Sequence, residues 1–420
     1  MPGRLRRAVV DVAPLRDSRQ FRLLFLGQLV SFVGRQITVA AAAYQVFQLT
    51  RSTFLVGLLS LAQLGPLLVL SLVGGSLADA MDRRRLLLVL QVLLAATSVG
   101  LAVNAGLDAP AVWPLFVLTA ASAGLSAVDN PTRSAAVPGM VVAAQLPAAL
   151  ALGQIIMQSG LALGPLLAGV VIAKVGVAAA FWVDTVTFGV AILTLVLMHP
   201  MAPEGGGTRM GFASVAEGFR FLRGRRALQG TFVIDVNAMV FGMPRALFPE
   251  MASRVFGGGA VTFGALSAAP GVGAIVGALF SGWVGRVHRQ GRAVLVAVGI
   301  WGLAIAVFGA TSFLPLALVM LAVAGTADMV SAVFRNSILQ LTVPDRLRGR
   351  LSAVHIAVVT GGPRVGDLES GAVASLTNPQ VSAVTGGLAC VAGVAVIGRA
   401  IPALGRWTAD RAEVEATTTA

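Results

Sequence analysis

The chain is poor in most of the residue types on which a soluble enzyme depends. Only 12% of its 420 residues are charged, about half the proportion of an ordinary soluble domain. The single cysteine, Cys390, excludes an intrachain disulfide and a thiolate metal centre. The histidines His199, His288 and His355 lack metal-ligand spacing, so we expect no metal site. Because no nucleotide-binding loop and no nucleophile–base–acid pattern occurs, we expect neither ATP-driven transport by this chain alone nor an enzyme.

Apolar residues, in contrast, are abundant and continuous. Hydrophobic residues make up 56% of the chain, and the mean hydropathy is +0.86. They form long stretches of the roughly 20 residues that a membrane-spanning helix needs, without the strict alternation of an outer-membrane barrel. The sequence therefore predicts an all-α polytopic membrane protein with twelve transmembrane helices. We place them at approximately 23–48, 54–77, 86–104, 112–128, 148–172, 179–198, 229–250, 261–284, 293–310, 314–333, 351–376 and 381–403.

One long polar stretch divides the predicted spans into six and six. The expected organisation is an N-terminal tail (1–22), an N-terminal six-helix bundle (23–198), a central loop (199–228), a C-terminal six-helix bundle (229–403) and a C-terminal tail (404–420).

Short patterns relate the two halves as pseudo-repeats. Residues 56–60 (VGLLS) match 263–267 (FGALS), and residues 160–165 (GLALGP) match 362–367 (GPRVGD). Chance similarity between helices rich in glycine and alanine is the alternative. Two parallel six-helix repeats would enclose a cavity near the bilayer midplane, which suits alternating access.

The basic residues indicate orientation. With the N-terminus taken as cytoplasmic, most of the 31 Lys and Arg residues fall on the cytoplasmic side. The positive-inside rule then predicts that both termini are cytoplasmic, and the arginine-rich, alanine-rich composition suggests a bacterial inner membrane. We therefore read the net charge of +13 as a topology signal and expect no nucleic-acid partner. Three exceptions lie on the opposite side (Arg51, Lys174, Arg254) and three within spans (Arg35, Arg245, Arg364).

The loop after the second predicted span carries the most specific motif. Residues 75–85 read GSLADAMDRRR, a tight turn with an acid placed to cap a helix and a basic cluster at the membrane surface. This segment resembles the signature loop of the major facilitator superfamily, Gly-x-Leu-Ala-Asp-Arg-x-Gly-Arg-Lys. It departs from that pattern at Ala80 and Asp82, and the matching loop of the second half (282–292) has Arg286 at the position of the motif aspartate. The resemblance implies a cytoplasmic gate formed by Gly75, Asp79, Arg83 and Arg84.

The fifth predicted span carries a second motif. Small residues four positions apart let two helices approach closely, and a proline there removes a backbone donor. The pattern resembles the antiporter motif of exporters in the same superfamily, with Ala168 replacing one glycine; ordinary helix packing is the alternative. The motif residues are Gly160, Gly164, Pro165 and Gly169.

Three further segments are similar to the enterobactin-exporter-type branch of the superfamily: 21–22 (FR), 218–222 (GFRFL) and 347–350 (LRGR). The similarity runs from about residue 20 to residue 405. It implies a monomeric exporter of a siderophore or an amphiphilic drug-like molecule, in contact with the lipid bilayer. The proton gradient would supply the energy, and no cofactor is expected.

Polar residues inside the spans are the candidate site, because a charge at a helix centre costs roughly 2.5–3.5 kcal/mol. Arginines there suit an anionic or catecholate group, and a carboxylate in a partly dry cavity suits proton coupling. Two alternatives are that Arg364 and Asp367 only neutralise each other and that Asp235 caps a helix. The fourth span, 112–128, contains no arginine of the kind that some superfamily members use. The candidate substrate and proton-coupling residues are Arg35, Gln36, Asp235, Asn237, Arg245, Arg364, Asp367 and Glu369.

Two other functions remain open at this point. One is uptake of a small solute, which the direction of flux would distinguish from export. The other is a non-transporting receptor or scaffold that keeps the fold, since a fold does not dictate a function.

Overall fold

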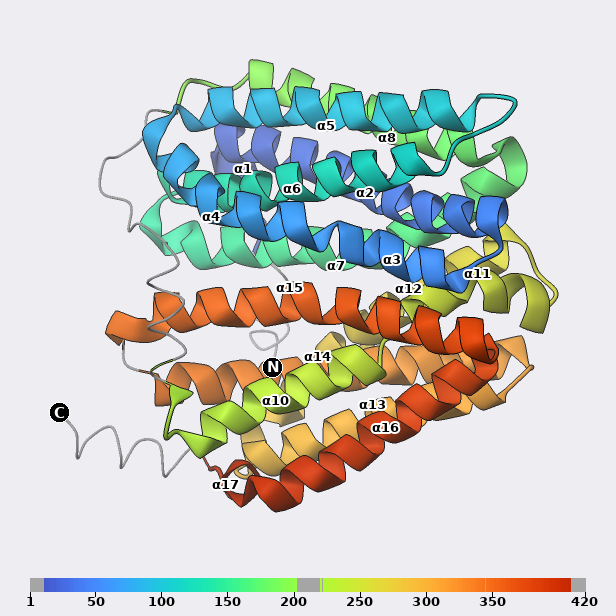
Figure 1. Ribbon diagram of the computed structural model, residues 1–420. Helices are drawn as coiled ribbons and strands as arrows, with labels where there is room; N and C mark the ends of the chain where they lie inside the picture. Colours follow the sequence, from blue (N-terminus) through green and yellow to red (C-terminus); the bar gives the residue numbers. More distant parts are fainter. Residues whose placement is uncertain (1–10, 202–219, 221, 344, 409–420) are drawn as a thin grey trace, which may run out of the picture. The chain divides into compact units, whose positions relative to one another are not determined.

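The structure is a computed structural model, and it describes residues 11–201, 220, 222–343 and 345–408. The side chains of residues 72–73, 75–76, 78–80, 285, 345–350, 352–354 and 356–357 also lie outside the described part. Every regular element in the described ranges is a helix (Figure 1). The chain forms two compact units: unit 1 comprises 1–42 and 65–209, and unit 2 comprises 43–64 and 210–420. The bundle limits expected from the sequence stay predictions.

In unit 1, α5 packs along α6 and α8 (Figure 1). Asp82 caps the start of α5 by accepting a hydrogen bond from the backbone N–H of Arg85 at 2.9 Å. Gly176, with φ of 103°, makes the sharp turn between α7 and α8, a conformation that favours glycine. The helices of this unit are α1 (Ala13–Asp17), the first part of α2 (Arg19–Thr50), most of α4 (Leu64–Ala80), α5 (Arg83–Ala105), α6 (Trp113–Ala136), η1 (Val137–Gly139), η2 (Ala143–Gln145), α7 (Leu146–Val175) and α8 (Val177–Val196).

In unit 2, α14 packs against both α12 and α13, and α15 packs against α3 and α10. The side chain of Ser52 caps α3 and that of Asn378 caps α16. The helices are α3 (Thr53–Ala62), α10 (Arg226–Phe241), η3 (Arg245–Leu247), α11 (Phe248–Glu250), η4 (Met251–Val255), α12 (Ala260–Leu279), η5 (Ser281–Arg286), α13 (Gln290–Ala310), α14 (Leu314–Thr342), α15 (Asp345–Leu376), α16 (Pro379–Ala400) and α17 (Pro402–Gly405).

Helices occupy all twelve predicted spans, but two spans are interrupted. The second predicted span is split into α3 and α4, and the seventh ends its regular helix at Phe241. Proline explains both breaks, because it lacks an N–H to donate to the carbonyl four residues earlier. Pro66 follows the end of α3 by four residues, and Pro244 follows the end of α10 by three.

Ten helices in the described part are long and apolar enough to cross a membrane. The other two predicted spans correspond to α6 and α15, which are 24 and 32 residues long but more polar. Large aliphatic side chains along the bundles are exposed, for example Val186 and Val296, as expected where the surrounding solvent is hydrocarbon. The all-α membrane fold is confirmed, and the count of twelve spans stays a prediction.

The antiporter-like motif lies where α7 packs against α2. A Cβ added to Gly160 would meet the ring of Phe32, and one added to Gly164 would meet the Cβ of Gln36. Pro165 and Gly169 are buried in the same helix. The two glycines therefore let the α7 backbone lie directly against α2, as small residues do in membrane helix pairs.

This close approach predicts a stability difference between two glycines of α7. We expect Gly164→Ala to lower the free energy of unfolding by roughly 1–3 kcal/mol through overpacking, seen as earlier loss of monodisperse protein on heating in detergent. Gly153→Ala is the matched control, because nothing lies within 4 Å of its Cβ position and alanine favours a helix. Equal losses in the two variants would contradict the close contact.

Candidate functional site

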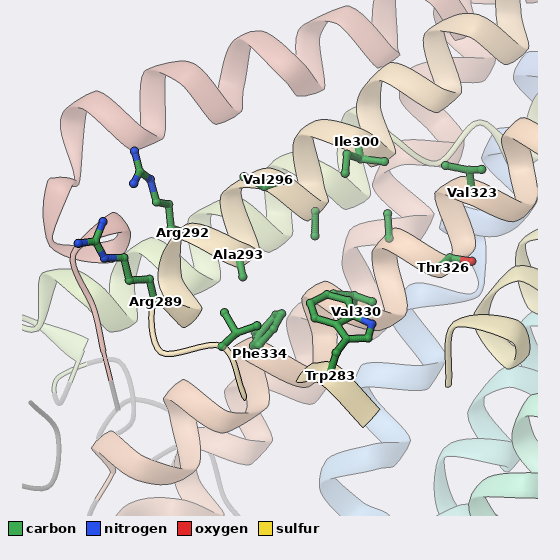
Figure 2. A pocket seen from close by; sticks show the side chains of 13 residues that line it. Trp283, Arg289, Arg292, Ala293, Val296, Ile300, Val323, Thr326, Val330 and Phe334 are labelled. Carbon is green, nitrogen blue, oxygen red and sulfur yellow. The ribbon is translucent and has the colours of Figure 1, made fainter. Parts of the chain in front are cut away.

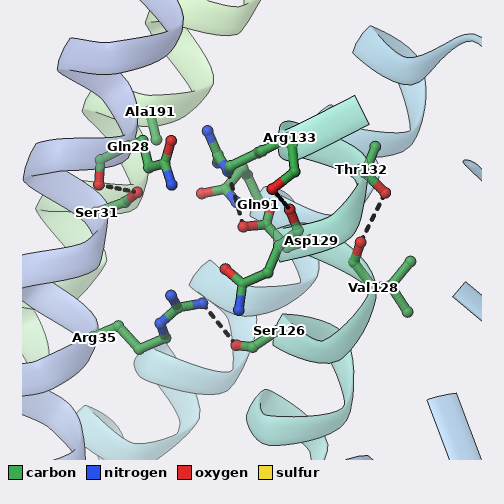
Figure 3. A network of polar contacts seen from close by, with 12 residues as sticks. Gln28, Ser31, Arg35, Gln91, Ser126, Val128, Asp129, Thr132, Arg133 and Ala191 are labelled. Atoms are coloured by element: carbon green, nitrogen blue, oxygen red, sulfur yellow. Dashed lines mark hydrogen bonds and ion pairs between the residues drawn. The ribbon is translucent and has the colours of Figure 1, made fainter. Parts of the chain in front are cut away.

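Unit 1 holds a buried polar network on α2, α5 and α6 (Figure 3). Asp129 pairs with Arg133 at 2.9 Å and accepts a hydrogen bond from the Gln91 amide at 2.8 Å. Arg35 donates to the Ser126 hydroxyl at 2.9 Å, and its guanidinium lies 5.0 Å from the ring centre of Phe32. The predicted site residue Arg35 thus reaches α6, next to a carboxylate–arginine pair.

Asp129 and Arg133 correct the expectation that the fourth span has no arginine. The polar sequence after Val128 looks like the end of the span, but α6 continues to Ala136 and turns these residues inward. The Arg133 side chain is only 3% exposed. The helix therefore contains a buried arginine, paired four residues from its acid.

A second buried acid of unit 1 has a different environment. Asp184 on α8 accepts hydrogen bonds from Ser98 at 2.6 Å and Thr38 at 2.7 Å. The Thr187 hydroxyl lies 3.3 Å from its other oxygen. These hydroxyl donors come from α5, α2 and α8, so Asp184 ties three helices together.

Unit 2 contains a group that we term the carboxylate-rich cluster: Asp235 on α10, with Asp328 and Arg335 on α14. The guanidinium of Arg335 lies 2.6 Å from Asp235 and 3.6 Å from Asp328. Arg335 and Asp235 are buried, whereas the Asp328 side chain is 34% exposed. One guanidinium therefore faces two carboxylates, and Asp235 serves as an ion-pair partner and not as a helix cap.

Next to it lies the arginine-rich cluster, formed by Arg245 on η3 with Arg364 and Asp367 on α15. Asp367 lies 3.5 Å from Arg245, and Ser60 and the backbone N–H of Ala246 also donate to it. Arg364 instead donates to the carbonyl of Thr360 at 2.5 Å, since helical side chains lean toward the N-terminus. In the structure the ion-pair partner of Asp367 is therefore Arg245, whose side chain is 51% exposed, and the alternative of a close pair between Arg364 and Asp367 is not seen.

A small cavity joins the two clusters. Arg245 and Asp328 both line it, together with Trp301 and the start of η3, and its volume is about 60 Å³. A water molecule occupies roughly 30 Å³ in the liquid, so the cavity fits water and is far below the roughly 300–1,000 Å³ of a small-molecule pocket.

Other predicted residues lie apart from these clusters. Asn237 donates to the carbonyl of Cys390 at 3.0 Å and so links α10 to α16. Gln36 packs against Gly164, and Glu369 is half-buried with no ion-pair partner in the described part of the chain. Among the described residues, no group of three or more His, Cys, Asp or Glu side chains is arranged to hold a metal.

The signature loop is attached to the end of α8. Arg84 donates to the carbonyls of Leu195 and Val196 at 2.8 and 2.7 Å. These carbonyls in the last turn of α8 have no donor within the helix, so Arg84 provides a hydrogen bond to each of them. Asp82, a departure from the family pattern, accepts from the backbone N–H of Met201 at 2.7 Å, and the backbone N–H of Arg83 donates to the carbonyl of Met201 at 3.1 Å.

Two predicted gate residues, Gly75 and Asp79, lie in α4, but their side chains are outside the described part. The segments 218–222 and 347–350, which carry part of the resemblance, also fall mostly outside it.

Arg133 and Arg335 lie outside the spans predicted from the sequence, because hydropathy falls before each of them. Two signals were available. Asp129 and Arg133 are four positions apart, and Asp328 and Arg335 are seven apart, so each pair shares a helix face. Arg133 and Arg335 are also separated by the same number of positions as Gly160 and Gly362, which relate the two pseudo-repeats.

Comparison with known proteins gives a consistent result. A family described as transmembrane secretion effector, of the major facilitator superfamily, matches residues 9–415. The enterobactin exporter EntS of Shigella boydii serotype 4 is 27% identical over 93% of this chain and 92% of its own length. That of Citrobacter koseri is 27% identical over 91% and 92%.

Solved structures share the fold at low identity. A bacterial homologue of the human lysosomal transporter Spinster, in an inward-facing and unoccupied conformation, aligns with a TM-score of 0.71 at 16% identity, covering 94% of this chain and 97% of that one. A D-xylose-proton symporter aligns with a TM-score of 0.69 at 14% identity, covering 92% and 98%. At these identities the likeness concerns the fold alone.

The buried pair of Asp129 and Arg133 leads us to expect that removal of one charge strongly destabilises the protein and that removal of the second charge restores most of the stability. We expect Arg133→Gln to cost about 3–5 kcal/mol, because it leaves the Asp129 carboxylate buried without a cation. The double variant Asp129→Asn/Arg133→Gln removes both charges and should recover most of that loss. Heating curves of the purified variants in detergent measure both effects. A double variant as unstable as the single one would contradict this account of the pair.

Proposed function

Because the chain belongs to the transmembrane secretion effector family of the major facilitator superfamily, we propose that it is a proton-coupled exporter. Its cargo would be a siderophore or an amphiphilic drug-like molecule. A transporter in the inner membrane with a small-molecule cargo follows from the family and from the helical membrane fold. The relatives named enterobactin exporters and the antiporter-like motif on α7 support export.

The carboxylate-rich cluster is the observation that carries proton coupling. With both acids ionised, the cluster has a net charge of −1, because Arg335 is the only cation among the described residues within ion-pair distance of them and Arg245 lies across the small cavity from Asp328. An uncompensated charge inside a membrane costs roughly 2.5–3.5 kcal/mol. Binding one proton removes that charge, so the cluster is suited to take up and release a proton as its surroundings change from wet to dry.

Asp328 is the better proton carrier of the two acids. Asp235 is buried and in close contact with Arg335, whereas Asp328 is partly exposed and a full 3.6 Å from the guanidinium. Asp328 also lines the small cavity, which has room for water. Protons would therefore exchange with Asp328 through the cavity, while Asp235 holds Arg335 in position.

The arginine-rich cluster has the opposite charge balance. Two guanidinium groups, those of Arg245 and Arg364, accompany one carboxylate, Asp367, so the cluster is left with a net charge of +1. Arg245 is half exposed and paired at only 3.5 Å, so it is available to a second anion. We assign it to an anionic or catecholate group of the cargo, with Arg364 in support.

The remaining predicted residues are proposed to serve access and energy transfer. The attachment of the signature loop to α8 through Arg84 suits a gate that latches the cytoplasmic side, with Gly75, Asp79 and Arg83 in the same loop. In unit 1, Arg35 contacts α6 through Ser126, and we propose that it has the role there that Arg245 has in unit 2. With both termini in the cytoplasm, inward proton flow would drive outward cargo movement.

Proton coupling of cargo transport can be tested in membrane vesicles. In inverted membrane vesicles with an imposed proton gradient, cargo should release the quenching of a pH-reporting dye. We expect Asp328→Asn to reduce this response at least about tenfold while downhill cargo movement persists. Asp108→Asn, an exposed acid in the loop between α5 and α6, is the control with the same chemical change.

The vesicle measurement also separates the rival functions. Cargo movement without any proton response would contradict proton coupling. Cargo movement only in the opposite direction would favour uptake of a small solute. A correctly inserted protein that moves no member of the panel, catecholate siderophores and lipophilic cations included, would favour a receptor or scaffold.

The proposed contact between Arg245 and an anionic cargo can be tested with cargoes of opposite charge. We expect Arg245→Gln to raise the KM for catecholate cargo about 10- to 100-fold, because a charge-assisted contact worth about 1.5–3 kcal/mol is lost. Lipophilic cations should be unaffected or transported better. Arg254→Gln, which removes an exposed arginine paired with Glu250 at 2.7 Å, is the control. Equal losses for anionic and cationic cargo would contradict the assignment of Arg245.

A further inference from the structure

The loop of unit 2 that matches the signature loop has a different structure from its counterpart. In unit 1 the arginine Arg84 is engaged by the last carbonyls of α8. In unit 2 the corresponding segment is the 3₁₀ helix η5 followed by Arg289 and Arg292 at the start of α13. Both arginines are exposed, and neither has an ion-pair or hydrogen-bond partner among the described residues.

A groove of about 540 Å³ begins at these arginines (Figure 2). Its floor is α14, and its walls are α13 and the η5 segment. The lining is otherwise apolar and includes Trp283, Val296 and Phe334. Figure 2 shows both guanidinium groups at one end, directed away from the apolar lining.

The groove faces the surroundings of the bundle. The aliphatic side chains of Val296 and Ile300 on its wall are 58% and 46% exposed, which in a membrane protein means contact with lipid. Along α13 the lining runs from Arg289 to Ile300, about 17 Å at 1.5 Å per residue. This length is close to one leaflet, half of the roughly 30 Å hydrocarbon core.

The chemistry of the lining selects the kind of occupant. Its only hydroxyl, that of Thr326, already donates to the carbonyl of Gly273 at 2.7 Å. Apart from the indole N–H of Trp283, the described residues of the walls offer no polar group without a hydrogen-bond partner, which is too little to recognise the several functional groups of a catecholate or a drug. A hydrocarbon chain fits them, and the only charged groups in the lining are two arginines at the end that the distribution of basic residues predicts to be cytoplasmic.

We propose that this groove binds an anionic phospholipid, with an acyl chain along α13 and α14 and its phosphate against Arg289 and Arg292. Basic pockets between helices on the cytoplasmic side are suited to anionic head groups, and each arginine near the surface contributes attraction. The stems of the arginines lie on the groove and their charges reach the interface. The second copy of the signature loop thus serves as a lipid site in place of a latch.

Fluorescence of Trp283 tests the proposal, because this side chain lies in the groove. The protein is placed in nanodiscs that contain a small fraction of lipid with brominated acyl chains, either phosphatidylglycerol or phosphatidylcholine. The signal from Trp283 is the difference between the unmodified protein and Trp283→Phe. We expect the anionic lipid to quench it at much lower molar fraction, with a preference of about thirtyfold at low salt.

Three variants locate the preference. Arg289→Gln/Arg292→Gln should abolish it, whereas Arg16→Gln/Arg85→Gln, which removes two exposed arginines of unit 1, should not. Ala293→Phe, which fills the groove without a change in charge, should also weaken quenching by the anionic lipid. Equal quenching by both lipids, or a preference that survives the loss of both groove arginines or the filling of the groove, would overturn the proposal. So would displacement of the lipid by transported cargo.

Discussion

The cost of a charge inside hydrocarbon governs the arrangement of this protein. Each unpaired charge at a helix centre costs roughly 2.5–3.5 kcal/mol, so the intramembrane acids and bases must find partners. Asp129 finds Arg133 four residues further along α6, and Asp235 on α10 finds Arg335 on α14. The ends of two helices agree with this requirement, because α6 and α14 extend beyond their apolar stretches and so bring Arg133 and Arg335 inside.

The two pseudo-repeats use the same arginine position for different purposes. In unit 1, Arg133 pairs with a single carboxylate, that of Asp129, which also accepts a hydrogen bond from the neutral Gln91 amide, so that the pair is buried and balanced in charge. In unit 2, Arg335 faces two carboxylates, and the neighbouring cluster around Arg245 has the opposite imbalance. A proton-coupling site needs a group that can bind a proton and water that can deliver it, and Asp328 beside the small cavity is suited to this. This asymmetry is the reason for placing the proposed exchange of proton and cargo charges in unit 2.

The signature loops show the same division of roles. Asp82 and Arg84 connect the first loop to the end of α8 and to Met201. The second loop lacks the motif aspartate and leaves its arginines exposed at one end of an apolar groove. The first signature loop thus binds another part of the protein, whereas the second is suited to bind lipid.

The sequence by itself determined the membrane fold, the family and the place of the helices, because apolar stretches of about 20 residues can only be satisfied by spanning helices. It also identified the signature loop and the small-residue spacing of α7, because each is a pattern of nearby positions in the chain, although only the structure shows that the α7 glycines contact α2. Only the tertiary structure decided the pairing of charges. Arg335 looked like a loop residue and Arg364 looked like the partner of Asp367, but partners depend on how one helix is rotated against another. Hydropathy contains no information on that rotation, since it records how polar a residue is and not which way its side chain points.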